Sequence, residues 1–343
     1  MSAASAGGGS LRRYLLTRVV LTLPMLLILL TVVFLLLRVA PGDPIRATLG
    51  DRLSPAQIEE RSEALGFNDP VIVQYARYVG GVFTGDLGDP LTDSRTTTGV
   101  IRDTFPATLE LTLFAIIVAV GVGVSVGALS GRLRDTPFDM GGRLFGIVIY
   151  AAPIFWLGLL AQLVFSRNLG WFPTGGRVVG FDVPNQVTGL YVFDSLITWN
   201  LPALRASLHH LVLPGVTLGL VFGGIFIRFV RVNMLQTLRA DYVESARARG
   251  VSERKVVLRH AFKNALVPVV TIVGLQFALL LGGAILTERV FSWPGTGSAI
   301  LGFIQARDYV GVQGMVTFFA VVVVIVSLLI DTLSAIIDPR IRY

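Results

Sequence analysis

Residues 111–131 read LTLFAIIVAVGVGVSVGALSG, a run of 21 residues in which no side chain is charged. A helix needs about 20 predominantly apolar residues to cross the hydrocarbon core of a bilayer. Elsewhere in the chain, five more runs of at least 19 residues satisfy the same condition: 19–37, 144–166, 206–227, 264–287 and 309–330. The pattern predicts an all-α, polytopic membrane protein with six transmembrane helices.

The composition excludes an ordinary soluble enzyme. Of the 343 residues, 53% are hydrophobic and 15% are charged, whereas soluble domains carry about 25% charged residues. The chain contains no cysteine, which excludes disulfides, thiol catalysis and cysteine-ligated metals, and its three histidines leave little for a metal site. We therefore expect neither a metal nor a cofactor in this chain.

Charge is distributed unevenly between the segments that connect the predicted spans. The segments 1–18, 132–143, 228–263 and 331–343 together carry a net charge of +10, and the alternate segments carry −3. Because positively charged loops stay in the cytoplasm, both termini are predicted to be cytoplasmic. The net charge of +7 then reflects topology and contact with anionic membrane lipid, and no nucleic-acid binding is expected.

Three parts make up the predicted domain organisation. Residues 1–10 are a flexible cytoplasmic tail of Ala, Ser and Gly. Residues 11–104 hold the first transmembrane helix, which is retained rather than cleaved as a signal peptide, followed by a small helical extracytoplasmic insert. Residues 105–343 form a core with the other five transmembrane helices.

Turn residues define the insert. The prolines within 39–44 predict a sharp turn after the first span. Ser54-Pro55 and Gly66 predict a helix over 55–65, and Asp69-Pro70 opens a second helix that runs to about Phe83. The carboxylates of these helices form either a solvated face or a docking surface for an external partner.

The segment 239–268 predicts two helices joined at a corner. Asp241 can cap a helix over about 241–250, and Gly250 can end it in a left-handed conformation. Ser252 can cap a second helix, which continues through His260 into the fifth span and meets Pro268. The predicted arrangement is a short helix, a glycine corner and a helix continuous with the membrane.

A helix as short as 241–250 is marginal in water by itself. Tyr242 and Ala246 lie four residues apart on one side, Ser245 is small, and Arg247 belongs to a basic rim. This pattern suits a helix docked in the groove of a partner. A basic helix lying on anionic lipid explains the pattern equally well, so both interpretations stay open.

The charge-free run 290–306 has 17 residues, with Ser, Thr, Pro and three Gly, and is expected to be a loop. It overlaps the segment 288–297, in which turn residues are interleaved with aromatic residues. Irregular backbone near membrane depth persists only where it is buried or lines a cavity. The segment is therefore either a re-entrant, gate-like loop or an ordinary loop with aromatic anchors.

These residues resemble a known family. Glu244-Ser245-Ala246 followed by Gly250 resembles the "EAA–x3–G" coupling loop of ABC importer permeases, with Ser245 in place of the first Ala. Further segments are more narrowly similar to the dipeptide/oligopeptide/nickel group, and the resemblance covers roughly residues 11–340. These segments are 40–44, 85–88, 106–111, 241–250, 260–268 and 288–295.

The resemblance implies a type I ABC importer permease fold in the cytoplasmic membrane of a bacterium. It implies three kinds of partner: a second homologous permease, two P-loop ATPase subunits or a fused one, and an extracytoplasmic solute-binding protein. The residues implied in ATPase coupling are Asp241, Tyr242, Glu244, Ser245, Ala246, Arg247 and Gly250. The residues implied in an external gate or in docking of the binding protein are Glu288, Phe291, Trp293, Pro294 and Gly295.

The chain is not expected to be an enzyme. It contains no Gly-Lys-Ser/Thr and so no P-loop, which leaves ATP and Mg²⁺ to partner subunits. The function implied by the resemblance is ATP-driven uptake of di-/oligopeptides, with nickel chelates or glutathione-like molecules as alternative substrates. An ion-coupled secondary transporter is the other class, but His209 and His210 are the only ionisable side chains in the six runs apart from tyrosine.

Overall fold

The computed structural model describes residues 7–38, 44–50, 53–178, 180 and 183–337. Within these ranges the regular structure is helical, and no strand is present. The chain divides into two compact units, each described by itself: Met1–Thr108 with Pro294–Leu329, and Leu109–Trp293 with Ile330–Tyr343. The observed architecture confirms the predicted all-α class.

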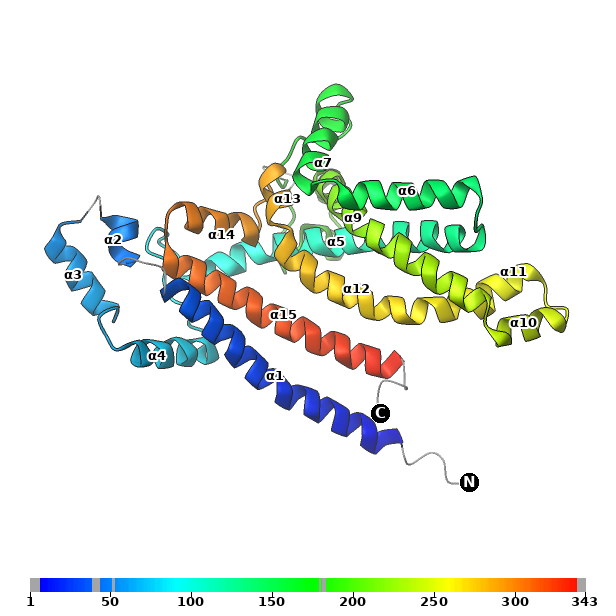
Figure 1. Cartoon of the computed structure of the whole chain (residues 1–343). Coiled ribbons are helices and arrows are strands. Elements are labelled where there is room, and N and C mark those ends of the chain that lie inside the picture. The colour runs from blue at the N-terminus through cyan, green and yellow to red at the C-terminus, as the bar shows by residue number, and fades with distance from the viewer. Residues whose placement is uncertain (1–6, 39–43, 51–52, 179, 181–182, 338–343) are drawn as a thin grey trace. The chain divides into compact units, whose positions relative to one another are not determined.

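Among the residues that the structure describes, five helices are long and apolar enough to cross a membrane. Figure 1 shows where they lie along the chain. They are α1 (Gly7–Arg38), α5 (Thr97–Arg132), α9 (Leu201–Leu238), the continuous helix Glu253–Gly282, and α15 (Tyr309–Ile337). Since α1 begins at Gly7, the last four residues of the predicted tail 1–10 are helical, and residues 1–6 lie outside the described ranges.

The predicted span 144–166 is not one straight helix. α6 (Pro137–Ala151) ends before Pro153, and α7 (Ile154–Ala161) continues into the π-helical η1 (Gln162–Asn168). The two halves are bent by 103° relative to each other, and together they make a sixth candidate span. The cause is Pro153, which lacks an amide donor and disfavours helical backbone at Ala152, whose ψ is 135°.

The first unit contains the predicted insert helices. α2 (Pro44–Leu49) was not predicted, and it is followed by α3 (Pro55–Ala64), which starts with a capping box between Ser54 and Gln57. α4 (Val71–Thr84) ends at Gly85, whose φ of +85° is left-handed. Both predicted insert helices are therefore confirmed, whereas the predicted turn over 39–44 falls on residues of which only Pro44 is described.

The expectation of a loop over 290–306 was wrong, because α14 (Thr296–Gln305) occupies more than half of it. Ile300 and Phe303 lie one turn apart and pack with Val100 and Met315 in a buried cluster of the first unit. Burial of this apolar side stabilises the helix despite its glycines, because tertiary packing contributes more than intrinsic propensity.

In the second unit, α9 lies at the centre and α6 runs along it (Figure 1). Glycines allow the close approach: a Cβ at Gly224 would lie 2.5 Å from the carbonyl oxygen of Gly146 on α6. On the side of α5, a Cβ at Gly123 would lie 2.1 Å from the Cβ of Phe226. Small residues at helix contacts are typical of packing in membranes, where close approach replaces a hydrophobic driving force.

Candidate functional site

The short helix α10 (Asp241–Ala248) follows α9 directly. Its N-cap is Ala240, with φ −74° and ψ 144°, so the prediction that Asp241 caps the helix was off by one residue. Asp241 and Glu244 both lie in the first turn. Their negative charges stabilise the helix there through its dipole.

The predicted glycine corner is confirmed. Gly250 has φ +74°, in the left-handed region. The amide of Val251 donates to the carbonyl of Ala246 at 3.2 Å, and the amide of Gly250 donates to that of Arg247 at 2.9 Å. This pair of bonds is a Schellman motif, which satisfies the last carbonyls of the helix. The chain therefore reverses over two residues.

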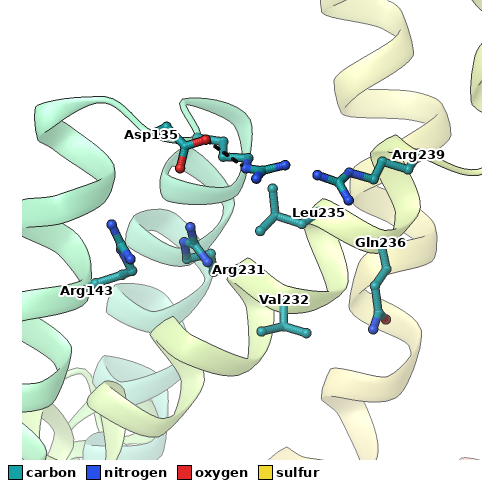
Figure 2. Close-up of a pocket in the computed structure, with 8 residues that line it drawn as sticks. Asp135, Arg143, Arg231, Val232, Leu235, Gln236 and Arg239 are labelled. Carbon is teal, nitrogen blue, oxygen red and sulfur yellow. Dashed lines mark ion pairs between the residues drawn. The ribbon is translucent and has the colours of Figure 1, made fainter.

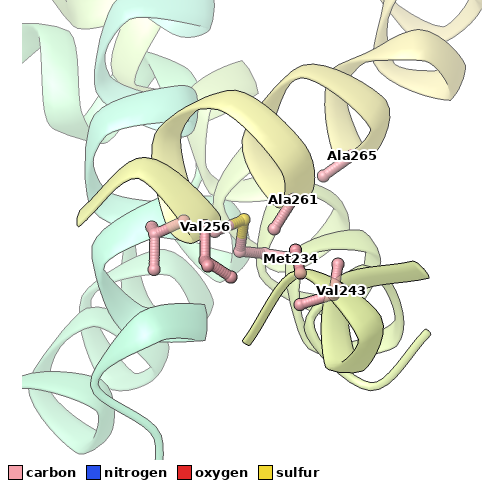
Figure 3. Packing of buried hydrophobic residues seen from close by; sticks show 7 residues of the cluster. Met234, Val243, Val256, Ala261 and Ala265 are labelled. Carbon is pink, nitrogen blue, oxygen red and sulfur yellow. The ribbon is translucent and has the colours of Figure 1, made fainter. Parts of the chain in front are cut away.

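One side of α10 is buried in the chain itself. Val243 and Ala246 are completely buried and pack with Met234 of α9 in a single cluster (Figure 3). The rest of this cluster comes from the helix that follows the corner: Val256, Val257, Ala261 and Ala265. The prediction that Ala246 faces a partner together with Tyr242 was wrong. The i, i+3 pair Val243 and Ala246 forms the apolar stripe of α10, and α9 covers it.

The opposite side of α10 is exposed and polar. Asp241, Glu244, Ser245 and Arg247 are all exposed. Tyr242 is 43% exposed, and its hydroxyl oxygen accepts a hydrogen bond from Asn264 at 3.1 Å. The helix therefore presents two carboxylates, a guanidinium and a phenol ring on a surface that the described chain leaves open.

An ion pair braces the corner. Arg247 Nε and Nη2 donate to the two carboxylate oxygens of Glu253 at 3.1 and 2.8 Å. The hydrogen bond to Glu253 raises the pKa of Arg247 above its ordinary value. Because Glu253 opens the next helix, this bidentate contact joins both arms of the corner.

The second arm leads into the membrane without a break. α11 (Glu253–Lys255), the π-helical η3 (Val256–Phe262) and α12 (Lys263–Gly283) follow one another directly. The predicted continuity between the corner and the fifth span is confirmed. The π segment was not predicted; such segments are rare and are frequently found at functional sites.

The predicted gate or docking residues are placed differently from expectation. Glu288 lies in α13 (Ile285–Val290) and is fully buried, and Phe291 and Trp293 are each 1% exposed. The carbonyl of Phe291 accepts from the amide of Gly176 at 2.7 Å. These three side chains cannot contact a docking partner in this arrangement, which corrects that part of the prediction.

The remaining two residues of that set lie in the first unit. Pro294 is exposed, and Gly295 is buried immediately before α14. The first amide of α14, that of Thr296, donates to Thr108 Oγ1 at 2.8 Å. Both Pro294 and Gly295 therefore connect two ordered segments.

A buried ion pair in the second unit was missed by the sequence analysis. Arg177 Nη2 lies 2.5 Å from Glu110 Oε2, and the side chains are 9% and 6% exposed. The amide of Val192 donates to Glu110 Oε1 at 2.6 Å. The Arg177 guanidinium lies 3.5 Å from the ring centroid of Tyr191 and 5.8 Å from that of Trp293. The available signal was the position of Glu110, directly before the charge-free run 111–131.

A carboxylate close to this pair orders the loop before α8 (Tyr191–Ile197). Asp194 is completely buried and accepts from the amides of Val187, Thr188 and Gly189 and from the hydroxyl of Thr188. Burial by itself raises the pKa of Asp194, but the hydrogen bonds from Thr188, Val187 and Gly189 outweigh it, so the pKa is below its ordinary value.

A second missed pair joins α6 to α9. Arg231 Nε and Nη2 donate to the two oxygens of Asp139 at 2.5 and 2.7 Å, and Asp139 is completely buried. The local signal was Thr136-Pro137, an N-cap and a first-turn proline, which places Asp139 at the third helical position. Within the described ranges, no group of three or more His, Cys, Asp or Glu side chains could hold a metal ion.

Comparison with known proteins gives two family matches. Residues 123–343 match the family described as "Binding-protein-dependent transport system inner membrane component". Residues 11–112 match the N-terminal part of the same class of membrane component.

Similar proteins cover nearly the whole chain. The "Dipeptide transport system permease protein DppB" of Alkalihalophilus pseudofirmus is 41% identical over 333 residues, which is 96% of this chain and 99% of that protein. The "Di/tripeptide transport system permease protein DppB" of Pseudomonas aeruginosa is 38% identical over 90% of this chain and 93% of that protein. The "Oligopeptide transport system permease protein AppB" of Bacillus subtilis is 35% identical, with coverage of 96% and 99%.

Proposed function

We propose that this chain, which belongs to the family of binding-protein-dependent transport system inner membrane components, is the translocation subunit of an ATP-driven importer of short peptides. The family is that of the ABC permease membrane subunit, a multi-pass membrane protein without ATPase activity of its own. The ATPase partners, the peptide substrate and the orientation of the termini belong to the proposal.

The observation that carries the proposal is the two-sided helix α10. Its apolar side, with Val243 and Ala246, is packed against its own chain, and its exposed side carries Asp241, Glu244 and Arg247. A helix held firmly from behind, with charged groups in front, can transmit a force applied to its front. This arrangement favours a docked partner over a helix lying on anionic lipid, since two carboxylates face outward.

The corner supplies a path for that force. From α10, contacts run through Ala246 to Val256 and Ala261, and the Arg247–Glu253 pair joins the arms directly. The second arm continues through η3 into α12, and together they form a candidate membrane span. A displacement of α10 would therefore tilt or rotate α12 and alternate the access to the pathway.

Partner subunits would supply the energy. The sequence lacks a P-loop, so ATP and Mg²⁺ would bind to two ATPase subunits or to a fused one, which would contact α10. A second homologous permease would complete the pathway, and an extracytoplasmic binding protein would deliver the substrate. With α10 on the ATPase side, both termini lie in the cytoplasm of a bacterium, in agreement with the charge distribution.

Short peptides are the substrate class that best fits the relatives, whose names specify dipeptides, tripeptides or oligopeptides. The role proposed here for Glu288, Phe291 and Trp293 is the support of an outer gate from within, since these side chains are buried. Nickel chelates and glutathione-like molecules are the alternative cargo. A panel of labelled dipeptides, tripeptides and chelates, supplied with the binding protein, would separate them by uptake.

The proposal is tested by charge reversal on the front of α10. Glu244→Lys should weaken co-purification of the ATPase subunits with this chain by about 2 kcal/mol, or roughly 30-fold in affinity. The matched control is Glu60→Lys, the same change at an exposed position of α3, and it should leave assembly unchanged. Binding of the ATPases is measured with the purified permease pair in detergent.

Two outcomes would contradict the proposal. Unchanged ATPase binding by Glu244→Lys would show that the front of α10 contacts something else, such as lipid. Uptake driven by an ion gradient in vesicles that contain this chain without its partners would indicate an ion-coupled secondary transporter instead.

A further inference from the structure

A pocket of about 430 Å³ lies between the α5–α6 turn and the C-terminal part of α9 (Figure 2). Its guanidinium groups come from both sides: Arg143 from α6, Arg231 from α9, and Arg239 from the C-cap of α9. Arg134 of the α5–α6 turn adds a fourth. The pocket belongs entirely to the second unit, and its residues play no part in the coupling role proposed for α10.

The positive charge in this pocket is only partly balanced. Asp139 binds Arg231 in bidentate fashion and lies 3.7 Å from Arg143, and Asp135 binds Arg134 at 3.0 Å. Among the residues that the structure describes, Arg239 makes no side-chain ion pair or hydrogen bond. Four guanidinium groups thus face two carboxylates, which leaves an excess of two positive charges around one cavity.

The arginines of the pocket suit an anion that carries several oxygen atoms. Arg231 is fixed by the buried carboxylate of Asp139, and the Arg143 and Arg134 side chains are 49% and 47% exposed. Planar guanidinium groups bind phosphate oxygens through paired hydrogen bonds. The combination of one anchored arginine with accessible ones forms a cradle for a phosphate group.

Two of the residues that line the pocket are apolar. Val232 and Leu235 line it on α9, and Val232 is 41% exposed. On α6, the helix that carries Arg143, an exposed stripe continues away from the pocket through Met140, Leu144 and Val148, which are 54%, 57% and 64% exposed. The phosphate cradle therefore lies at the end of an apolar helix surface within a candidate span.

From this combination we propose that the pocket binds the phosphate group of an anionic phospholipid, with its acyl chains along the exposed stripe of α6. A free phosphate would use the guanidinium groups but not the stripe. A basic pocket between transmembrane helices, on the side where positive charge gathers, is typical of lipid headgroup sites. The bound lipid would join α6 to α9 at the base of the corner.

The test uses the full-length chain purified in detergent and native mass spectrometry to count retained lipids. Wild-type protein should retain phosphatidylglycerol in preference to phosphatidylcholine. Each neutralised arginine should lower the affinity for phosphatidylglycerol about fivefold, as expected for about 1 kcal/mol per basic side chain, so Arg239→Gln alone should give about fivefold and Arg143→Gln with Arg239→Gln about 25-fold. Arg254→Gln, an exposed position outside the pocket, is the control and should retain wild-type binding.

Three results would overturn the proposal. Equal retention of phosphatidylglycerol by wild type and by Arg239→Gln would show that the pocket is not the site. If millimolar inorganic phosphate displaced phosphatidylglycerol from the wild-type protein, the ligand of the pocket would be a free anion. Loss of ATPase binding by Arg239→Gln, with lipid binding unchanged, would assign the pocket to an acidic partner side chain. Arg239 makes no ion pair among the described residues, so its replacement tests the pocket without breaking the Asp139–Arg231 pair.

Discussion

The α10 corner and the turn that follows α13 contain similar types of residue, but their aromatic and acidic side chains differ in exposure. Each combines an aromatic residue, an acidic residue and a tight turn beside a membrane-spanning helix. In the corner, Tyr242 and Glu244 are exposed, whereas in the turn Trp293 and Glu288 are buried. Of these two aromatic and acidic pairs, only the pair in the corner is therefore open to contact.

The difference lies in what covers each segment. Two small or branched residues, Val243 and Ala246, are enough to bury one side of α10 and leave the charges in front. The turn is enclosed by the segment around Gly175 and Gly176, with Arg177 against Trp293. The corner is thus suited to contact, and the turn to holding its surroundings in place.

The largest expected effect is at the centre of the enclosed turn. Trp293→Ala should lower the free energy of unfolding by about 4 kcal/mol, since truncation of a buried aromatic ring leaves a cavity. Trp199→Ala, at a tryptophan that is 87% exposed, is the control and should change little. Thermal unfolding of the purified chain in detergent measures both. Equal melting temperatures for the two variants would contradict the difference in burial between Trp293 and Trp199.

The next effect concerns the Glu110–Arg177 pair. Glu110→Gln or Arg177→Met alone should cost about 3 kcal/mol, because each leaves an uncompensated buried group. The double variant should recover most of this loss, since no isolated charge remains. A double-mutant cycle on thermal unfolding gives the coupling energy. Strictly additive losses would mean that the two side chains act independently.

A smaller effect on stability, but a selective one on coupling, is expected at Gly250. A Cβ there meets nothing within 4 Å, yet the φ of +74° strains a β-branched residue. Gly250→Val should cost about 1–2 kcal/mol and lower peptide uptake per ATP hydrolysed. Gly85→Val imposes the same strain on α4, where a Cβ also has open space. Comparable uncoupling by both variants would contradict a special role for the corner.

The smallest effect is a pH dependence near the enclosed turn. Asp194 has a lowered pKa in the folded chain, so it contributes stability that is present above its unfolded pKa of about 3.9 and is lost as the pH falls through the folded value. The melting temperature should therefore drop below about pH 4. Asp194→Asn should be less stable at pH 7 and lose this pH step. The exposed Glu60→Gln variant should retain this pH step. If the melting temperature of Asp194→Asn depended on pH as in the wild type, the assignment to Asp194 would be refuted.

Local signals in the sequence were sufficient for much of the fold. Long charge-free runs predicted the spans, because the length of an apolar helix is set by the bilayer. The corner at Gly250 and the cap at Ser54 were predicted because turn chemistry depends on a few neighbouring residues. The bend at Pro153 was missed, since the surrounding run is apolar enough to suggest a single span.

Burial and long-range pairing were beyond the sequence. Glu110 and Arg177 are 67 residues apart and Asp139 and Arg231 are 92 apart, so no local pattern connects them. On α10, Ala246 was grouped with the exposed side although it is buried, because a small residue is compatible with either side until α9 is placed. The α14 helix was missed because the glycine content of the segment suggested a loop. The burial of Ile300 and Phe303, which stabilises the helix, depends on residues far away in the sequence.

The π segment η3 gives the corner a further mechanical property. Its seven residues, Val256–Phe262, are wound more loosely than an α-helix. Each residue of an α-helix turns the chain by about 100°. A one-residue register slip within this loose winding would spin everything downstream in α12 by about that angle. A displacement of the corner could thus be converted into a rotation of α12 about its own axis.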